Sequence, residues 1–494
     1  MSSVSSDPAY EPVIGLEVHA QLLTESKAFC GCSTKFGNSP NTNVCPVCLG
    51  LPGALPVLNK RAVEFAIRMA LATSSSVSPR SVFARKNYFY PDLPKGYQIS
   101  QYADPICTGG FVDIEPSEQG HEPRRIVIAR IHLEEDAGKS IHDRNGFTLV
   151  DINRCGVPLL ELVSEPDLRS PHEASLYLRK IRQLVTYLGI CDGNMEEGNL
   201  RCDANISVRR KGYKRFGTKT ELKNLNSFRN VERALEFEMK RQIRALEGGE
   251  RIKQETMLWD AEKNVALPMR SKEEAHDYRY FPEPDLVPVV VDKEWTAEIR
   301  AALPEHPTAR RDRFVRQYAL RGYDADVLTA EKEYADFFEE AVKSYGARNN
   351  DEFKQVSNWV MTEVLRVAGE GRSVQDRFPV SPDRLARLIR LVADGTVSGR
   401  SAKEVFAEML LVPDDPRSIV EKKGLVQLSD EAVLERIIDD VLVKYPSHAE
   451  KYRAGNEKLL GYFVGRVMEA SKGKANPALV NHILVKKLSR TKSF

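Results

Sequence analysis

Two segments far apart in the sequence share one alternating pattern, and this pattern constrains the fold. In residues 13–21, apolar positions alternate with polar ones, which are Glu17, His19 and Gln21. Residues 200–208 alternate in the same way, and their polar positions are Arg201, Asp203, Asn205 and Ser207. Alternation with period two predicts half-buried strands. If the strands share a sheet, their polar faces would form a metal and anion site.

Composition limits the classes of protein to which the chain can belong. With 494 residues, 42% of them hydrophobic and 29% charged, the chain is too long for one compact core and suits two or three domains. No stretch approaches the roughly 20 apolar residues of a membrane-spanning helix. Residues 1–7 lack the charged and apolar regions of a secretory leader, so we expect a cytoplasmic protein. The net charge is only +2, so a nucleic-acid partner would need a local basic surface.

The order of the expected elements predicts an α+β domain followed by helical domains. Up to Val291 the pattern indicates strands of an antiparallel sheet, interrupted by helices at about residues 59–72, 171–188 and 227–247. After the Pro-rich residues 281–288, helical periods dominate. We therefore predict a catalytic domain at 1–291, a helical domain at 292–411 and a helical tail domain at 412–494.

The prolines and asparagines of the helical part predict where its helices begin and end. Two prolines suggest a linker at residues 378–384, and Pro413 and Pro416 suggest a second break. Near the end, Asn456 is expected to cap a helix that reaches about Ser471, and Asn476 precedes a helix that ends near Leu488.

Four cysteines form two close pairs and predict a structural zinc site. Two pairs joined by a loop are the usual way in which a chain surrounds zinc with four thiolates. A closed set of four sulfur ligands is typical of structural zinc, since catalytic zinc keeps a position open for water. The alternative is four unrelated reduced thiols. The cysteines are Cys30, Cys32, Cys45 and Cys48.

Acids and amides recur in several Gly/Pro-flanked strands and predict a magnesium site. Clustered carboxylates repel one another unless a cation lies among them, and hard oxygen ligands suit magnesium. Glu161 lies in an apolar run and therefore needs a partner. Glu135 is the exception in geometry, because it shares the parity of Ile131 and Leu133. Each residue taken alone could equally be a solvated or structural side chain. The set comprises Glu17, His19, Glu135, Glu161, Asp203, Asn205 and Glu221.

No phosphate-binding glycine loop accompanies these acids. Gly138-Lys139-Ser140 matches the end of such a loop, but Leu133 stands where its first glycine belongs and three acids precede it. If ATP is used, it must be held by magnesium and basic side chains on the sheet.

The last 24 residues are basic and form a candidate surface for a phosphate backbone. They contain no acid, and their cations are Lys472, Lys474, Lys486, Lys487, Arg490 and Lys492. The alternative is a solvated C-terminal segment. Aromatic Tyr462 and Phe463 beside Arg466 favour base stacking, although core packing would use them equally.

At these motifs the chain resembles the family of aspartyl/glutamyl-tRNA amidotransferase B subunits. The resemblance extends over essentially the whole chain. It rests on Gly15-Leu-Glu-Val-His19, Arg85-Lys-Asn-Tyr-Phe-Tyr-Pro-Asp92, Glu134-Glu-Asp-Ala-Gly-Lys-Ser140, Asp151-Ile-Asn-Arg154, Met195-Glu-Glu-Gly198, Arg201-Cys-Asp-Ala-Asn-Ile-Ser207, Glu221-Leu-Lys-Asn-Leu-Asn-Ser227 and Asp277-Tyr-Arg-Tyr-Phe-Pro-Glu-Pro-Asp285.

The resemblance implies a fold, a reaction and partners. It implies a cradle-shaped catalytic domain related to glutamine synthetase, a helical domain and a tail domain that touches tRNA. The implied ligase reaction transfers the γ-phosphate of ATP to the side-chain carboxylate of Glu-tRNA(Gln) or Asp-tRNA(Asn), and ammonia then displaces phosphate. In this family the ammonia comes from an amidase, which is the A chain of a heterotrimer, and the heterotrimer is completed by a small C chain.

The resemblance also implies roles for individual residues. By motif position, His19, Glu135 and Glu221 would bind magnesium, while Glu17, Glu161, Asp203 and Asn205 would shape the site of phosphoryl transfer. The four cysteines match the zinc-bearing members. Two other interpretations of the sequence are a free-standing ATP-dependent carboxylate–amine ligase and a non-enzymatic, zinc-bearing scaffold that binds tRNA.

Overall fold

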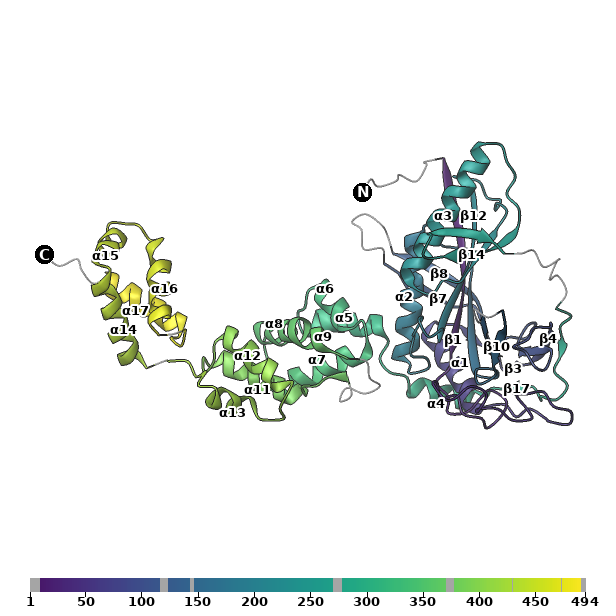
Figure 1. Cartoon of the computed structure of the whole chain (residues 1–494), viewed down its shortest axis with the longest axis horizontal. Coiled ribbons are helices and arrows are strands. Elements are labelled where there is room, and N and C mark those ends of the chain that lie inside the picture. Colours follow the sequence, from purple (N-terminus) through teal and green to yellow (C-terminus); the bar gives the residue numbers. More distant parts are fainter. Residues whose placement is uncertain are drawn as a thin grey trace. The chain divides into compact units, whose positions relative to one another are not determined.

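The computed structural model describes residues 9–115, 123–142, 146–269, 278–369, 377–428, 430–471 and 473–489. The chain divides into two compact units, residues 1–307 and 308–494. The first unit combines a large sheet with helices and the second is helical, so the expected α+β class is confirmed (Figure 1).

A ten-stranded sheet forms the centre of the first unit. All its neighbouring strands are antiparallel except β13 and β14. β7 (Phe111–Ile114) pairs with β8 beside the main order. That order is β15 (Val265–Pro268), β14 (Glu255–Asp260), β13 (Thr220–Lys223), β12 (Leu200–Arg210), β1 (Tyr10–Gln21), β11 (Pro158–Ser164), β8 (Arg124–Glu135), β6 (Cys107–Thr108) and β2 (Ser76–Val77).

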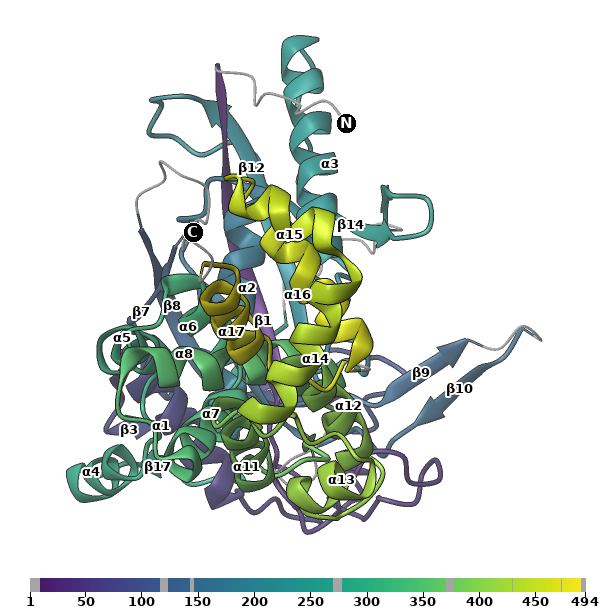
Figure 2. The same ribbon diagram turned by 90° about the vertical axis from the view of Figure 1, so that its left-hand side faces the viewer.

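Three helices cover one face of this sheet, the face opposite the polar side chains of its central strands. They are α1 (Lys60–Ala72), α2 (Pro171–Tyr187) and α3 (Phe228–Glu247), and they pack against β8, β1 and β12 respectively (Figure 2). Leu16, Val18 and Ala20 of β1 are buried in this core, as the alternating pattern predicts. The polar residues of β1 therefore lie on the opposite face.

Local capping explains where the three helices begin. Asn59, Ser170 and Ser227 each accept a hydrogen bond from a backbone N–H in the first turn. Gly248 follows the end of α3. The helices expected at these positions are confirmed to within a residue or two.

Smaller sheets and a short helix complete the first unit. β4 (Ala84–Asn87) pairs with β5 (Tyr97–Ser100) and β16 (Phe281–Pro282). β9 (Lys139–His142) pairs with β10 (Thr148–Asp151), and β3 (Arg80–Ser81) pairs with β17 (Val289–Val290). α4 (Lys293–Ala301) adds Ile299 to the core of the first unit, so packing continues past the expected boundary at Val291.

The second unit contains two separate apolar cores. Phe338, Leu388 and Phe406 belong to the first core, and Ile438 and Phe463 belong to the second. The elements around the first core are α5 (Pro307–Gln317), α6 (Gly322–Leu328), α7 (Lys332–Tyr345), α8 (Asn350–Trp359), the π-helix η1 (Val360–Val364), α9 (Leu365–Val367), α11 (Pro382–Ala393), α12 (Gly399–Met409) and α13 (Pro416–Lys422). Those around the second are α14 (Glu431–Lys444), α15 (Pro446–Arg453), α16 (Leu459–Ala470) and α17 (Pro477–Ser489).

Three expectations for the helical part differ from the structure. The linker expected at 378–384 is wrong, because Phe378 and Val380 are buried in the first helical core and α11 begins at Pro382. The break expected at residues 412–416 does separate α12 from α13, but the domain boundary expected after residue 411 lies within that core, since α13 contributes Ile419 and Val420. Asn456 does not cap α16, which begins after Lys458 without a side-chain cap.

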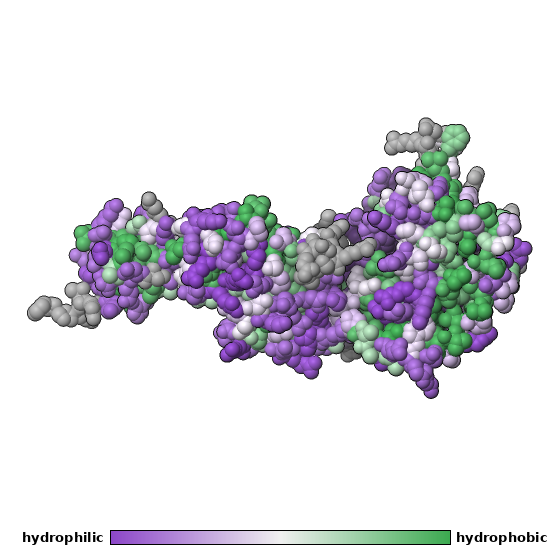
Figure 3. All heavy atoms as spheres, turned by 90° about the horizontal axis from the view of Figure 1, so that it is seen from below, coloured by the Kyte–Doolittle hydropathy of each residue, from purple (hydrophilic) through white to green (hydrophobic). Residues whose placement is uncertain are grey.

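The surface of the first unit carries many apolar side chains (Figure 3). Exposed examples at its surface include Leu55, Val57, Val287 and Val290. None of the helices in the described ranges is both long and apolar enough to cross a membrane.

Candidate active site and metal sites

The register of three central strands gathers a carboxylate and imidazole cluster on the polar face of the sheet. His19 of β1 lies opposite Glu161 of β11, and Glu17 lies opposite Asp203 of β12. The Nε2 atom of His19 is 3.3 Å from Glu161 and 3.7 Å from Glu17. One ligand atom from each of Glu17, His19 and Glu161 falls within 4.8 Å of the others, a spacing that can hold one cation.

Two further residues of this cluster come from β8. His132 lies opposite Glu161, and its Nε2 atom is 3.3 Å from a Glu161 carboxylate oxygen. Together with Glu134, these side chains form a second group with ligand atoms within 4.8 Å. Sequence reasoning did not single out His132 and Glu134. Their parity was the available signal, because Arg130, His132 and Glu134 alternate with buried Ile131 and Leu133.

The pKa values of the cluster indicate surplus negative charge. Burial and the neighbouring charge of Glu161 raise the pKa of Glu17 to about 7. Burial and Glu161 also raise the pKa of Glu134. Although burial opposes it, hydrogen bonding and charge from Glu161 raise the pKa of His19 to about 9. Burial likewise opposes the low pKa of Glu161, which His132 and His19 hold well below its usual range.

This cluster fits a divalent cation. A bound cation favours the ionised form of the carboxylates whose pKa values are raised, Glu17 and Glu134, so metal and protons compete for the same oxygens. The buried Nδ1 atom of His132 has no hydrogen-bond partner among the described residues. Glu17, Glu134 and Glu161 supply the oxygen ligands that magnesium prefers.

Glu135 lies outside both groups. Its carboxylate pairs with Lys95 and accepts a 2.9 Å hydrogen bond from the backbone N–H of Ile99. This placement follows the parity of the strand, since Glu135 ends β8 on the side of Ile131 and Leu133. The structure therefore gives Glu135 a cationic partner of its own.

Glu221, Asp203 and Asn205 line the neighbouring strands instead. Asn205 lies opposite Gly15 of β1 on one side and Glu221 of β13 on the other. Lys223 bridges two acids, with its Nζ atom 3.0 Å from Asp203 and 3.2 Å from Glu221. Strand β12 separates this cation on β13 from Glu17 on β1, but its charge still acts on the Glu17 carboxylate, so positive charge borders the cluster.

Asp136 anchors the other end of the polar face. Its carboxylate receives a 2.9 Å hydrogen bond from Arg201 and a 2.6 Å hydrogen bond from Gln21, and Arg154 lies 3.5 Å away. Burial alone would raise the pKa of Asp136, but Arg201 and Arg154 outweigh it and lower the pKa. Two arginines are thereby fixed beside the site.

Tyrosines form a rim beside Glu134. Tyr102 and Tyr280 stack with ring centroids 4.1 Å apart, and Lys86 lies 4.9 Å above the ring of Tyr278. Burial and the charges of Glu134 and Glu161 raise the pKa of Tyr280, which places this rim within electrostatic range of the cluster. Asp277 of the same motif lies outside the described residues.

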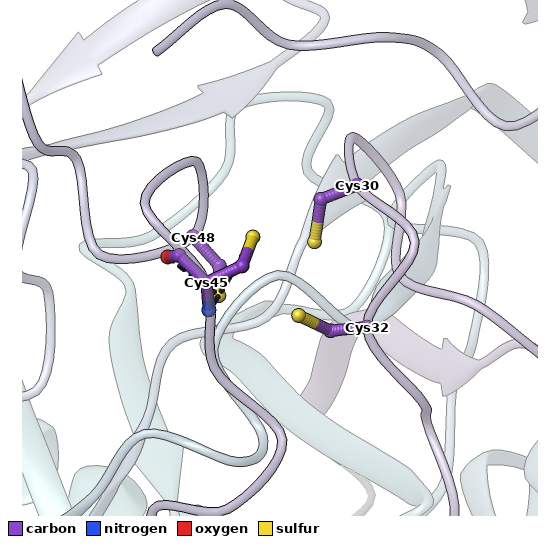
Figure 4. A group of neighbouring side chains, drawn as sticks. All are labelled: Cys30, Cys32, Cys45 and Cys48. Atoms are coloured by element: carbon purple, nitrogen blue, oxygen red, sulfur yellow. Dashed lines mark hydrogen bonds between the residues drawn. The ribbon is translucent and has the colours of Figure 1, made fainter.

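The four cysteines converge in the loops that follow β1 (Figure 4). Their sulfur atoms all lie within 4.8 Å of one another, and the sulfurs of Cys45 and Cys48 are 3.9 Å apart. A tetrahedral zinc site with 2.3 Å bonds needs sulfurs roughly 3.8 Å apart, so these thiols fit zinc. Buried Lys27 places its Nζ atom 3.6 Å from the sulfur of Cys48. The pKa of Cys48 is lowered to about 4, chiefly by a hydrogen bond from Cys30.

Comparison with known proteins identifies the family. The family model described as the GatB/GatE catalytic domain matches residues 12–297, and the GatB domain model matches residues 336–488. The aspartyl/glutamyl-tRNA(Asn/Gln) amidotransferase B subunit of Thermodesulfovibrio yellowstonii is 56% identical over 97% of this chain and 99% of its own length. The protein of the same name from Geotalea uraniireducens is 57% identical over the same shares. The chain therefore belongs to the family of aspartyl/glutamyl-tRNA(Asn/Gln) amidotransferase B subunits.

Proposed function

We propose that this chain is the ATP-dependent ligase subunit of a tRNA-dependent amidotransferase. Its substrate would be glutamate on tRNA(Gln) or aspartate on tRNA(Asn), and its product the corresponding amide. The gathering of Glu17, His19, Glu134 and Glu161 in a domain that matches the family's catalytic model carries this proposal. A location in the cytoplasm follows from the tRNA substrate.

The reaction has two steps whose atoms balance. An oxygen of the side-chain carboxylate attacks the γ-phosphorus of ATP, the bond to the bridging oxygen breaks, and ADP leaves. Ammonia then attacks the activated carbonyl carbon, the bond to the phosphate oxygen breaks, and a proton is lost. Activation is needed because a carboxylate is too poor an electrophile to accept an amine.

The position of each residue on the polar face indicates its part in the reaction. Glu17, His19, Glu134 and Glu161 are placed to hold magnesium, which when bound would neutralise charge on the transferred phosphoryl group. Arg201 and Lys223 border the cluster and can orient phosphate oxygens. Asp203 fixes Lys223, and Asn205 offers an amide two residues further along β12, opposite Gly15.

Glu135 and Glu221, which the family resemblance implies as magnesium ligands, have other partners here. Lys95 holds Glu135, while Lys223 and the hydroxyl of Thr256 hold Glu221. We infer that they shape the flanks of the site, since each would have to leave a cation to ligate a metal. The zinc site would be structural, because all four of its ligands are sulfur.

We infer that the chain works within a heterotrimer, together with an amidase as the A chain and a small C chain. Its relatives are named as B subunits, which supports an assembly of several subunits. Exposed apolar residues such as Leu55, Val57 and Val287 support protein contacts at the surface of the first unit. Ammonia released by the amidase would reach the polar face of the sheet.

Replacement of Glu161 tests the proposal. In the assembled enzyme, Glu161→Gln should lower amide formation on misacylated tRNA at least a hundredfold, because the carboxylate shared by both groups is lost. Glutamine hydrolysis by the amidase should change little. Each misacylated tRNA is assayed separately by chromatography of the released amino acid. Glu262→Gln, on the exposed turn after β14, is the matched control.

The outcomes separate the proposal from its rivals. Unchanged amide formation by Glu161→Gln would contradict the assigned site. Amidation of free glutamate by the isolated chain would indicate a free-standing ligase instead. Binding of tRNA without any ATP turnover in the full assembly would indicate a scaffold.

A further inference from the structure

Lys27 is a buried lysine between the cysteine cluster and the turn formed by residues 151–156. Its exposed fraction is 0%, although lysine is almost never fully buried without a partner. Its Nζ atom lies 3.6 Å from the sulfur of Cys48 and donates a 3.3 Å hydrogen bond to the carbonyl of Ile152. Among the described residues Lys27 forms no ion pair with a carboxylate, since Glu135 lines the same cavity but is paired with Lys95. The sulfur of Cys48 is therefore the group that faces this charge.

Four thiolates around zinc carry more negative charge than the ion neutralises. The sulfur spacing of the cluster fits tetrahedral zinc, and four thiolates with one Zn²⁺ have a net charge of about −2. A buried ammonium group beside one of the sulfurs offsets part of that charge and donates a hydrogen bond to it. Loss of a group that hydrogen-bonds to a metal ligand commonly weakens metal binding about ten- to a hundredfold. Lys27 occupies the place of such a group.

The turn 151–156 packs directly against Lys27 and Cys48. Gly156 has a φ angle of +83°, and a Cβ atom there would lie 3.3 Å from Cδ of Lys27 and 3.6 Å from Cβ of Cys48. The carbonyl of Gly156 accepts a 2.8 Å hydrogen bond from the backbone N–H of Ala28. The sulfur of Cys155 lies 3.7 Å from the carbonyl oxygen of Cys48. The inner side of the turn is therefore in contact with the cysteine cluster.

On the solvent side, the loop between the two cysteine pairs holds the same turn. The side chain of Asn41 donates a 3.1 Å hydrogen bond to the carbonyl of Val150 and accepts a 2.8 Å hydrogen bond from the N–H of Ile152. The N–H of Asn43 donates a 2.7 Å hydrogen bond to the side chain of Asn153. Zinc at the cysteines would fix both ends of this loop, so the turn is clamped from two sides.

The turn also carries Arg154, which lies at the edge of the candidate active site. The guanidinium of Arg154 donates hydrogen bonds of 3.0 Å and 2.7 Å to the carbonyls of Ala137 and Gly138, and it lies 3.5 Å from Asp136. The N–H of Gly156 donates a 2.8 Å hydrogen bond to the carbonyl of Asp136. Movement of the turn would therefore displace both Arg154 and Asp136.

We propose that Lys27 is a positioning residue that links the zinc site to the active site. Its ammonium group bonds to the zinc-bound sulfur of Cys48 on one side and to the carbonyl of Ile152 on the other. When zinc is bound, Lys27 thereby holds the turn 151–156 and keeps Arg154 beside Asp136. The inference rests on the structural zinc site proposed above and gives that site a part in shaping the polar face of the sheet.

Replacement of Lys27 in the assembled enzyme tests its contact with the zinc-bound sulfur. Lys27→Met keeps the apolar stem without the ammonium group, and it should bind zinc at least tenfold more weakly in competition with a chelator. With cobalt(II) in place of zinc, the sulfur-to-metal charge-transfer band should move to longer wavelength, because a thiolate without a cationic donor gives up electrons more easily. Lys35→Met is the matched control, since Lys35 is exposed in the loop between the cysteine pairs, and it should change neither measurement.

Hydrogen exchange tests the link from zinc to the turn. Peptides that cover residues 150–157 should exchange at least tenfold faster in Lys27→Met, even with zinc in excess, and in the parent enzyme after its zinc has been removed. Asn41→Gly permits the same backbone conformation, with φ near +59°, but removes the two side-chain hydrogen bonds on the solvent side. This variant should speed exchange of the turn and leave the zinc affinity and the cobalt band unchanged.

The two parts of the proposal can fail separately. An unchanged zinc affinity and cobalt band in Lys27→Met would overturn the contact with the sulfur. Exchange of the turn that responds neither to zinc nor to Lys27 would overturn the link to the active site. Thermal unfolding shows whether Lys27→Met folds, and if it does not, Lys27→Gln carries the metal measurements and zinc removal carries the exchange. None of these measurements needs ATP turnover, so failure of the parent enzyme to use ATP would overturn the proposed function alone.

Discussion

Glu161 shows how one residue can set the chemistry of its neighbours. Its carboxylate lies 3.3 Å from both His19 and His132, and its negative charge keeps a proton on His19 while raising the pKa of Glu17. A bound divalent cation would reverse this arrangement, because it stabilises the carboxylates and competes with the protons. The carboxylates around Glu161 therefore bind either protons or a metal ion.

Single residues of this cluster were only partly predictable. The alternation in β1 placed Glu17 and His19 on one face, and the apolar run around Glu161 indicated a partner for its charge. His132 and Glu134 could have been found from the alternation of β8. The partner of each residue could not be predicted, because it depends on which residues the strand register places opposite one another.

Removal of one zinc thiolate gives a test at a single residue. Cys45→Ser should reduce bound zinc from one per chain to a small fraction, because a three-sulfur set holds the ion less tightly. Metal content is measured by mass spectrometry of the purified chain. Cys107→Ala is the control, since this buried thiol lies outside the cluster. A parent protein without zinc would disprove the metal assignment.

Helices whose ends are set by neighbouring residues were predicted well. Segments whose structure depends on contacts with distant residues were not. Helices α1, α2 and α3 begin at side-chain caps visible in the sequence. The segment 378–384 looked like a linker because of its prolines. In the structure Phe378 and Val380 fill a core whose other side chains come from distant helices, which no local pattern reveals.

An ion-pair network between α5 and α7 predicts pH-dependent stability of the first helical core. Glu339 lies 2.6 Å from both Arg310 and Arg313 and accepts a 2.9 Å hydrogen bond from Tyr318. Burial opposes the shift, but these partners lower the pKa of Glu339. Because the folded pKa is lowered, the carboxylate stabilises the fold above its unfolded pKa, about 4.3. That stability is lost as the pH falls through the folded pKa.

Glu339→Gln should therefore destabilise α5 and α7 at pH 7 by about 1–2 kcal/mol, a value reduced for partial exposure. Hydrogen exchange of peptides from both helices measures the change. The difference from the parent should shrink as the pH falls below the unfolded pKa of about 4.3, and it should disappear only below the lowered folded pKa, where Glu339 is protonated in both states. Glu340→Gln, exposed on the same helix, is the control. A difference that persists unchanged in acid would show that charge is not the cause.

At the scale of the whole molecule, charge is nearly balanced, so nucleic-acid binding must come from local surfaces. The net charge of +2 excludes general attraction to tRNA. In the C-terminal segment, Lys487 pairs with Asp439 at 2.6 Å and is partly neutralised. Lys474 and Lys486 are exposed and remain available to phosphates, while Lys472, Arg490 and Lys492 lie outside the described residues.

This division predicts which tail lysines bind tRNA. In the assembled enzyme, Lys474→Ala combined with Lys486→Ala should weaken tRNA binding and reduce the slope of log K against log salt by about 2, one for each lost phosphate contact. Lys487→Ala should change the slope less, because the ammonium group of Lys487 is already paired with Asp439. Filter binding at several salt concentrations measures the tRNA affinity and the slope for each variant. The KM for ATP should stay the same. An unchanged slope in the double variant would place the tRNA surface elsewhere.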